Sequence, residues 1–392
     1  MGQGKFVISQ LCAYVSRYEF GKCVERYPSK RKHRKLSCWG QFILMMFGQL
    51  THRESIRDIF TCLNAHPSAV YHLGIKQLVS VSSLTRANEQ RDWRIYADLA
   101  AVLLAQARSV YQQEGDLIEG LENAVYAFDS TTIDLCLKVF FWAHFRRTKA
   151  AIKLHTLLDL RGNLPTFIYI SDAKKHDIKG LGELIPVLQQ EAFYIMDRGY
   201  ADFGRLSRIH QAKAYFVVRV KNNLAFNRLE SRKVDKDTGL RCDQTIKLTG
   251  PVTSQKYKGK LRRVKVYDTA NKTTLILATN NFEITALQVA QLYKQRWQVE
   301  LFFRWIKQHL KITKFWGHSI NAVKTQIWIA ICSFLIVAIA RKKLNVELTL
   351  YQMLQIISVS PFSKEPLNQL FSTILPQSSS NNDSNQLKIM EL

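Results

Sequence analysis

The sequence predicts an α/β core that is interrupted by a β-rich insertion and preceded by an all-α domain. The core is predicted because short apolar runs, rich in β-branched and aromatic residues, alternate with a helical pattern over residues 121–220. The insertion is predicted because short β-like runs separated by Gly, Pro, Asn and Asp occupy residues 221–285. The all-α domain is predicted because apolar residues recur at helical spacing in residues 1–114.

The all-α domain carries a basic stretch that is a candidate for contact with phosphates. The seven residues from Ser29 to Lys35 are one Ser, one His and five Lys or Arg. Such stretches are often merely solvated, but we favour contact with DNA phosphates. The side chains that we assign to DNA contact here are Arg31, Lys32 and Arg34. The helices expected in this domain are Trp39 to Leu50, Ile56 to Leu63 and Arg91 to Tyr111.

A further helix in this domain has the features of a DNA-reading helix. Residues 82–91 begin with two serines suited to N-capping and follow a short connection, as the second helix of a helix-turn-helix does. Arg86 and Arg91 can donate hydrogen bonds to base edges, as can Asn88 and Gln90. An ordinary capped helix explains the same residues equally well, and both interpretations stay open.

Two aspartates mark the core as a candidate site. Asp129 lies inside Val125 to Ile133, which is typical of a buried strand, and a buried carboxylate is costly unless it is paired or bound to metal. A satisfied structural aspartate is the alternative. Asp197 directly follows the apolar run Phe193 to Met196, and acids at strand ends often face a site. Asp202 is a weaker candidate for a supporting role.

The order of elements between these aspartates indicates the fold. Two β-like runs, Ile152 to Asp159 and Leu164 to Ser171, are followed by a helix from about Ile178 to Gln190 and by the strand that precedes Asp197. This order matches the ribonuclease H-like fold: three strands, of which the first carries an acid, are followed by a helix and by a strand with a second acid. A helix that carries a Glu comes later. Such a fold brings distant residues to one edge of a sheet, so we expect the acids to meet there.

The insertion follows a strand, Ala214 to Val220, and interrupts the core. Its β-like runs are Thr245 to Leu248, Arg262 to Tyr267 and Thr273 to Ala278. A basic strip within it is placed to track a DNA strand, or else protects a solvated edge strand. The strip consists of Lys256, Lys258, Lys260, Arg262, Arg263 and Lys265. After the insertion we expect the second part of the core at residues 286–345, a C-terminal helical region at 346–376 and a disordered Ser/Asn-rich tail at 377–392.

The second part of the core contains one helix with an unusual mixture of charges, Leu292 to Ile312. Four of its side chains are spaced Y-x-x-R-x-x-x-E-x-x-x-x-x-x-K, which places them on one face at 3.6 residues per turn. These are Tyr293, Arg296, Glu300 and Lys307. The residues between them are so apolar that the helix must be largely buried, and charges on a buried helix need partners. Supporting i,i+4 pairs on a surface helix are the alternative.

Taken together, these motifs resemble bacterial insertion-sequence DDE transposases of the IS-four group, which the Y-R-E-K signature defines. The matching motifs are Asp129 in FDST, Asp197 in DRGYADF and Glu300 in YKQRWQVELFFRWIK. They occur in the expected order on the expected elements, and the resemblance covers most of the chain. The first eighty or so residues look like the N-terminal domain of one branch of this group.

The resemblance implies an enzyme and a set of catalytic residues. Asp129, Asp197 and Glu300 would hold two divalent cations, Mg²⁺ or Mn²⁺, about 3.5 to 4 Å apart, for cleavage of DNA and transfer of the cut strand. Tyr293, Arg296 and Lys307 would hold phosphates near the cleaved end. A homodimer joining two element ends is also implied.

Whether the reaction passes through a DNA hairpin stays open. Some relatives hold a flipped base with a Trp of the insertion, whereas this chain has no Trp between Trp142 and Trp297. The insertion offers other aromatic side chains that can stack on a base. These are Phe226, Tyr257 and Tyr267.

The charge of the chain predicts a polyanionic partner. With 56 Lys and Arg against 31 Asp and Glu, the formal net charge is +25 and the pI is about 9.8, which favours double-stranded DNA, here the terminal inverted repeats and the target. A membrane is not expected, because the longest apolar run, Ile327 to Ala340, is shorter than a span and suits a buried helix. The absence of a signal-peptide pattern in Met1 to Ser16 and of any C-x-x-C pair predicts a bacterial cytoplasmic, nucleoid-associated protein.

Two other functions compete with transposition. A non-catalytic DNA-binding regulator derived from a transposase would share the charge and the helical domain, but it has no need of the three carboxylates. The complete triad with its flanking motifs therefore favours the enzyme. A nuclease that cuts without strand transfer would use the same active site.

Overall fold

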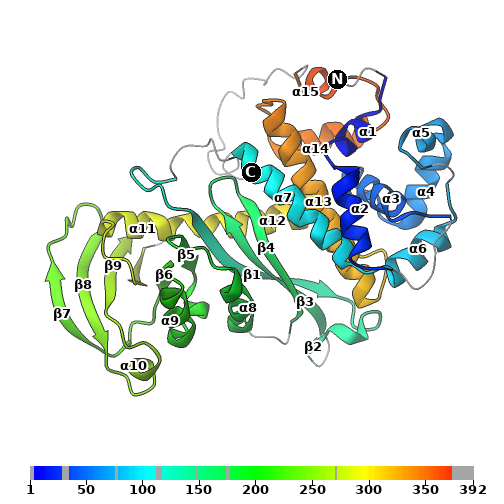
Figure 1. Cartoon of the computed structure of the whole chain (residues 1–392). Coiled ribbons are helices and arrows are strands. Elements are labelled where there is room, and N and C mark those ends of the chain that lie inside the picture. The colour runs from blue at the N-terminus through cyan, green and yellow to red at the C-terminus, as the bar shows by residue number, and fades with distance from the viewer. Residues whose placement is uncertain are drawn as a thin grey trace.

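A helical part and a part built on one sheet make up the molecule, and Figure 1 shows them side by side. The structure is a computed structural model that describes residues 4–28, 35–75, 78–111, 117–146, 149–173, 177–269 and 272–372. The N-terminal helices are α1 (Val7–Cys12), α2 (Arg17–Glu25), α3 (Cys38–Leu50), α4 (Ile56–Asn64), α5 (Pro67–His72), α6 (Val81–Gln90) and α7 (Arg94–Tyr111). The predicted all-α organisation of this part is confirmed.

Serine caps set the starts of several of these helices. The side chain of Ser37 accepts a hydrogen bond from the backbone of Gly40 at the start of α3. Ser55 and Asp58 form a reciprocal capping box at the start of α4. Ser80 caps α6, which ends at Gln90 because Arg91 takes an extended backbone conformation. The helix that was expected to start at Arg91 therefore begins at Arg94.

The sheet has the strand order of a ribonuclease H-like core. Its strands β4, β3 and β1 are antiparallel neighbours, and β5 and β6 follow beside β1 in parallel. The short strand β2 also pairs with β3. The bounds are β1 Val125–Leu135, β2 His144–Arg146, β3 Lys149–Asp159, β4 Leu164–Asp172, β5 Phe193–Met196 and β6 Tyr215–Arg219.

The insertion extends this sheet instead of forming a separate one. Strand β10 pairs antiparallel with β6, and β9, β8 and β7 continue outward in that order. The new strands are β7 (Phe226–Arg232), β8 (Leu240–Leu248), β9 (Leu261–Asp268) and β10 (Thr273–Thr279), with the short helix α10 (Thr253–Lys256) between β8 and β9. Strand β7 has no apolar pattern because its middle residues are exposed, which is why sequence periodicity did not predict it.

Alternating side chains give the sheet two packed faces. On one face, residues such as Tyr126, Phe128 and Met196 pack with helices α8 (Asp177–Leu184) and α9 (Phe203–Gln211). On the other face, Ala127 and Ile195 belong to the core that also contains α7, α11 (Ala286–Gln295) and α12 (Trp297–His309). Helix α8 is shorter than expected: a 3₁₀ turn containing Pro186 follows it.

The long apolar helix α13 (Ile320–Lys343) is the centre of the helical part. It is long and apolar enough to cross a membrane by composition, but 89% of its most apolar window is buried inside the protein. It packs against α3, α6, α7 and α14 (Leu350–Val359), which confirms the predicted core helix. Because α13 comes from the second part of the core, the boundary predicted near residue 114 separates segments of chain but not two hydrophobic cores.

The chain described by the structure ends with α15 (Leu367–Ser372). Residues 1 to 3 and the predicted disordered tail, residues 377–392, lie outside the described residues. The basic stretch at residues 29–34 also lies outside them.

Candidate active site

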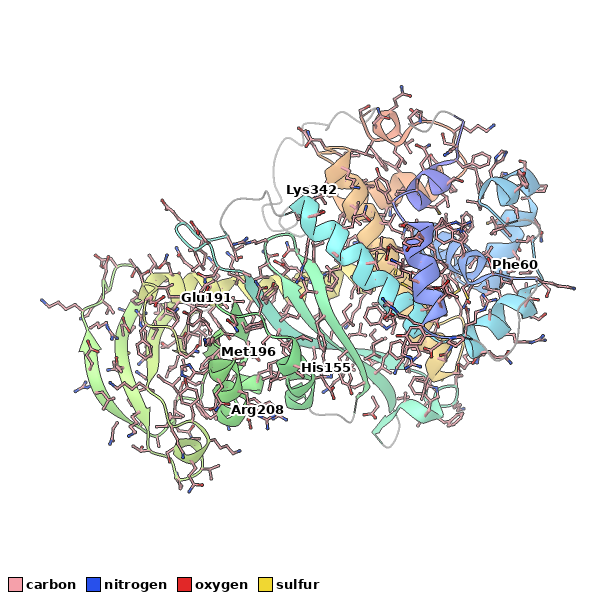
Figure 2. All side chains as sticks on the ribbon, viewed as in Figure 1. Phe60, His155, Glu191, Met196, Arg208 and Lys342 are labelled. Atoms are coloured by element: carbon pink, nitrogen blue, oxygen red, sulfur yellow. The ribbon has the colours of Figure 1, made fainter. Side chains whose placement is uncertain are left out.

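Strands β1 and β5 bring Asp129 and Asp197 to the same face of the sheet. The two strands are parallel and in register, with Phe128 opposite Met196. Asp129 is the next residue of β1, and Asp197 directly follows the end of β5 with an extended backbone. Met196 is labelled in Figure 2 near the middle of the sheet. Since side chains alternate, both aspartates point away from α8 and α9 and toward the face that carries α11 and α12.

Helix α12 lies along an edge of β1 that no strand occupies. Strand β5 pairs with β1 only as far as Phe128, whereas β1 continues to Leu135. The backbone carbonyl groups beyond Phe128 therefore need other partners on that side, and Lys307 supplies one by donating from Nζ to the carbonyl oxygen of Thr132 at 2.8 Å. The apolar side of α12 packs against β1 and β3, which fixes the exposed stripe that carries Glu300.

The helix predicted from Leu292 to Ile312 is interrupted at Arg296. Helix α11 ends at Gln295 and α12 begins at Trp297, and Figure 1 shows the two following one another end to end. The hydrogen bonds around the junction tighten to 3₁₀ type: the Arg296 N–H donates to the Tyr293 carbonyl, and the Arg296 carbonyl accepts from Val299. Tyr293 is thus on α11, whereas Glu300 and Lys307 are on α12.

The Arg296 guanidinium joins two of the three carboxylates. Its Nη1 donates to Oδ2 of Asp129 at 3.2 Å, and its Nη2 lies 2.7 Å from Oε1 of Glu300. The side chains of Arg296 and Asp129 are 16% and 18% exposed, so this contact is partly shielded from water. Burial alone would lower the pKa of Arg296, but Glu300, Tyr293 and Asp129 outweigh it and raise that pKa.

Tyr293 connects the third carboxylate to the same group. Its hydroxyl donates a hydrogen bond to Oδ1 of Asp197 at 3.5 Å, and the Arg296 guanidinium lies over its ring at 5.9 Å. Burial raises the pKa of Tyr293, while Arg296 and Arg219 oppose the rise. The phenol therefore stays protonated at neutral pH and acts as a donor.

Burial and neighbouring charge make Asp129 the most perturbed acid of the site. Burial raises its pKa to about 6, and the negative charges of Glu300 and Asp197 act in the same direction. The Ser130 N–H, which donates to Oδ1 at 2.8 Å, and the Arg296 guanidinium partly oppose this. A strongly raised pKa of a carboxyl group that lies beside two further carboxylates is typical of functional sites.

The donor set fits divalent cations. Among the described residues, no three His, Cys, Asp or Glu side chains are already arranged to hold a metal ion. Instead, the guanidinium of Arg296 lies between Asp129 and Glu300 and contacts both carboxylates. Carboxylate oxygens are the ligands that Mg²⁺ prefers, and extra positive charge here would favour the charged form of Asp129, whose pKa is raised chiefly by burial.

Comparison with known proteins decides the family. Residues 121–336, more than half of the chain, match the family model described as Transposase DDE domain. The chain is 34% identical to the putative transposase y4zB of Sinorhizobium fredii over 66% of this chain and 71% of that protein. The chain belongs to the DDE transposase family. It is a bacterial insertion-sequence transposase, an enzyme that cleaves DNA and transfers strands.

Other matches extend over more of this transposase. It is 25% identical to the putative transposase for insertion sequence element IS4SA of Synechocystis, over 84% of this chain and 88% of that protein. Residues 3–76 match a second family model, Domain of unknown function (DUF4372). A solved structure of piggyBac transposase, a synaptic complex with hairpin DNA, covers 96% of this chain and 84% of its own with a TM-score of 0.42 and 12% identity.

The N-terminal DNA-contact candidates of the transposase have different positions. Arg86 is exposed on α6, as a DNA-contacting residue must be. Arg91 is only 3% exposed, and its Nη1 donates to the carbonyl of Ser37 at 2.8 Å and to Oε1 of Gln41 at 3.0 Å. This occupied, buried guanidinium is a structural group, so the assignment of Arg91 to DNA contact is corrected; Asn88 is buried in the same network. Arg31, Lys32 and Arg34 lie outside the described residues.

The insertion also departs from expectation in two places. Arg262 of the predicted basic strip is buried on β9 and forms a bidentate ion pair with Asp243 of β8, at 2.8 Å for both contacts. Its guanidinium is therefore part of the strand packing. Of the three aromatic candidates for base stacking, Tyr257 is 2% exposed and its burial raises its pKa, so its ring faces the core and is not available to a base.

Two cationic residues near the site escaped the sequence patterns. Arg219 ends β6, the strand beside β5, and acts electrostatically on Tyr293. The parallel order of β5 and β6 was the missing signal, because carboxyl ends of parallel strands share one edge. Arg304 is exposed on α12 one turn after Glu300, and the i,i+4 spacing by itself would have revealed it.

Proposed function

We propose that Asp129, Asp197 and Glu300 are the catalytic residues with which this transposase cuts DNA at the ends of its insertion sequence and joins those ends to target DNA. The observation that carries the proposal is the convergence of three carboxylates, from β1, the end of β5 and α12. Arg296 pairs with Asp129 and Glu300, and Tyr293 connects Asp197 to Arg296. Residues 68 and 171 positions away from Asp129 meet there, as the differences 197 − 129 and 300 − 129 show.

The proposal includes two divalent cations, Mg²⁺ or Mn²⁺, held by the oxygens of Asp129, Asp197 and Glu300. When bound, such cations activate the attacking oxygen and stabilise the leaving oxygen of an in-line displacement at phosphorus. Arg296, which pairs with Asp129 and Glu300 in this structure, would then be available to pair with a phosphate. Tyr293, bonded to Asp197, holds that carboxylate in one orientation.

DNA binding is proposed for the cationic side of the same face. Arg296 would fork onto a phosphate near the cleaved end, and Lys307, two turns after Glu300 on α12, would add a point charge. Exposed Arg304 extends the stripe along α12. Arg86 on α6 and the basic residues Arg31, Lys32 and Arg34 would hold the terminal inverted repeat farther from the cut. The net charge of +25 supports an extended contact with double-stranded DNA.

The reaction joins two element ends to one target, so we propose that the working form is a homodimer in which each copy holds one end. A protein of this charge would act on chromosomal DNA in the bacterial cytoplasm, in association with the nucleoid. The burial of α13 among α3, α6 and α7 supports this location, because its apolar surface is already covered.

The test is cleavage of labelled linear DNA that carries the terminal repeats flanking the gene, with Mg²⁺ or Mn²⁺. Wild type is compared with Glu300→Gln and Asp197→Asn, which keep the shape of each side chain and remove its charge. We expect metal-dependent nicks at the repeat ends with wild type, joined products on longer incubation, and neither with the variants. Binding of the repeats should persist in both variants.

Each other outcome identifies a different function. Nicks without joined products would identify a nuclease. Specific binding of the repeats without cleavage in either metal would identify a DNA-binding regulator. Equal cleavage by wild type and Glu300→Gln would remove Glu300 from the catalytic set.

A further inference from the structure

The connection between α12 and α13, residues 310–319, is held by two buried glutamine side chains. It contains no regular helix or strand, so its backbone N–H and carbonyl groups need partners elsewhere. Gln49 of α3 and Gln326 of α13 supply them, and these two side chains are 0% and 1% exposed. A buried amide with all its partners inside one loop fixes the position of that loop.

Gln326 binds the connection from the α13 side. Its Nε2 donates to the carbonyl oxygens of Lys311 at 2.6 Å and Lys314 at 2.9 Å, and its Oε1 accepts from the N–H of Trp316 at 2.8 Å. Both hydrogens of its amide are therefore used. This half of the arrangement is local, since Gln326 follows the connection directly in sequence.

Gln49 binds the same connection from the N-terminal region. Its Oε1 accepts from the N–H of Lys311 at 2.8 Å, and its Nε2 donates to the Lys311 carbonyl at 3.3 Å. The contact spans 262 positions in sequence. Through the backbone of Lys311, α3 of the N-terminal region thus binds the segment that follows α12.

Glu54 and Trp316 add a second contact at the same place. The Glu54 carboxylate pairs with the ammonium groups of Lys311 and, at 3.0 Å, of Lys314, and its backbone carbonyl accepts from Nε1 of Trp316 at 3.1 Å. The Trp316 ring lies so close to α3 that a Cβ at Gly48 would be 2.6 Å from its Cη2 atom. A glycine at this position permits the contact.

The contacts of Gln49 and Glu54 with residues 311–316 affect Glu300 through helix α12. Glu300 lies nine positions before His309, the last residue of α12, or roughly 14 Å at the rise of an α-helix, and Lys311 follows two residues later. The intervening helix is buried along one side, and Leu310 and Ile312 at its end are buried as well. A shift of Lys311 therefore moves α12 as a body, and with it the carboxylate that pairs with Arg296.

We propose that the N-terminal region matched by the domain of unknown function, residues 3–76, positions Glu300 for catalysis through the contacts of Gln49 and Glu54 with residues 311–316. The inference rests on the proposed catalytic role of Glu300. In it Gln49 is a positioning residue: it touches neither substrate nor metal and acts only by holding the end of α12.

The first test measures amide hydrogen exchange of the full-length protein without DNA, for wild type, Gln49→Leu and Gln41→Leu. Gln41 is the matched control, because it lies on the same helix, is equally buried, and bonds to Asn88 and Arg91 instead of the connection. We expect exchange of the amides at 311–316 and along α12 to quicken about tenfold or more in Gln49→Leu alone. Equal exchange in the two variants would overturn the proposal.

The second test measures single-turnover cleavage and DNA affinity separately. Gln49→Leu should lower the cleavage rate at saturating DNA and Mg²⁺ by about ten- to a hundredfold, since small displacements of a catalytic group are costly, and change the DNA Kd less than about twofold. Gln41→Leu should leave the rate within about twofold. A loss of rate shared by both variants would mean general destabilisation and would contradict the positioning role.

Glu54→Gln provides a variant that folds, because Glu54 is on the surface. It should lower the cleavage rate about two- to threefold, and the difference from wild type should vanish at high salt, which screens the ion pairs with Lys311 and Lys314. An unchanged rate at low salt would count against the second contact. If wild type does not cleave at all, the proposed function fails, whereas the exchange measurement still decides whether Gln49 holds α12.

Discussion

Arg296 donates a hydrogen bond to Asp129 at 3.2 Å across 167 positions of sequence, and so joins the junction of α11 and α12 to the middle of strand β1. The contact is partly shielded from water, and the same guanidinium continues to Glu300. One cation therefore balances two carboxylates that come from different elements of the fold. The stability of this region and its response to metal ions both depend on that balance.

Removal of the Arg296 charge should destabilise the metal-free protein. In Arg296→Gln the carboxylates of Asp129 and Glu300 face each other without a counter-ion, and breaking a partly buried pair costs about 2–4 kcal/mol. Urea unfolding in EDTA measures the loss. Millimolar Mg²⁺ should recover most of it, because a bound divalent cation replaces the missing charge. If Mg²⁺ leaves the free energy of unfolding of both wild type and Arg296→Gln unchanged, the carboxylates do not bind the ion.

The response of stability to metal ions should depend on Asp129, and Asp202→Asn is the matched control for Asp129→Asn. Asp202 is a neighbouring acid in the DRGYADF motif, but it caps α9 by accepting from the Arg205 N–H at 2.9 Å. We expect Mg²⁺ and Mn²⁺ to raise the Tm of wild type and Asp202→Asn alike, and to leave the Tm of Asp129→Asn unchanged. Loss of the metal response in Asp202→Asn would place Asp202 among the ligands.

The pKa of Asp129 predicts a pH dependence of stability in EDTA. Burial raises that pKa from 3.8 to about 6, so the folded state binds the proton more tightly than the unfolded chain. The stabilising contribution of Asp129 is therefore fully present below about pH 3.8 and is lost as the pH rises through 6. The shift corresponds to roughly 3 kcal/mol at 1.36 kcal/mol per pH unit.

Asp129→Asn removes this titrating group and provides the comparison. The free energy of unfolding of the variant relative to wild type should increase by roughly 2.4 kcal/mol between pH 4 and pH 7.5, because part of the change lies below pH 4. Denaturant titrations at four or five pH values measure it. A difference that stays constant over this range would mean that Asp129 has the same pKa in the folded and unfolded chains.

Substitution of Arg86, on α6, should affect DNA binding, whereas substitution of Arg91, which follows α6, should affect stability. Arg91→Ala removes a buried guanidinium bonded to Ser37 and Gln41, so it should cost about 3–5 kcal/mol of stability. Arg86→Ala should change stability by less than about 0.5 kcal/mol, weaken binding of the terminal repeats and lower the salt slope of binding by about 1. Equal DNA affinity of wild type and Arg86→Ala would exclude α6 from the DNA interface.

The buried ion pair of the insertion should behave as a unit. Arg262→Met leaves Asp243 charged and unpaired between β8 and β9, which should cost about 3–5 kcal/mol. The double variant Arg262→Met with Asp243→Leu should recover most of this loss, because both charges are then replaced by apolar groups. A double-mutant cycle measures the coupling. Additive losses would show that the pair makes no net contact in solution.

Local patterns in the sequence predicted most of the elements and were the basis for proposing the catalytic candidates. Asp129 within an apolar run, Asp197 at the end of another and the spacing from Tyr293 to Lys307 each depend on neighbours a few positions away. The structure places those side chains on one face, with the exception that the predicted single helix is divided at Arg296. At that residue the backbone hydrogen bonds are of 3₁₀ type and the side chain contacts Asp129, 167 positions away, which no local pattern contains.

Other assignments failed because burial is a property of the whole fold. Arg91 and Arg262 look like surface cations in sequence, yet each is enclosed by partners from another element, Ser37 and Gln41 for the first and Asp243 for the second. Tyr257 likewise faces the core instead of solvent. Charge and aromaticity can be counted along the chain, but exposure cannot.

The sequence by itself determined the class of the protein: a basic chain with two strand-borne aspartates and one helix-borne glutamate in the order of a DDE transposase. Only the tertiary structure decided how these parts depend on one another. In the folded protein α13 packs among the N-terminal helices, the core sheet continues into the insertion, and Gln49 hydrogen-bonds to Lys311. The physical reason is that secondary structure follows from local periodicity and caps, whereas pairing across hundreds of positions follows from the burial of surfaces that meet only in the folded chain.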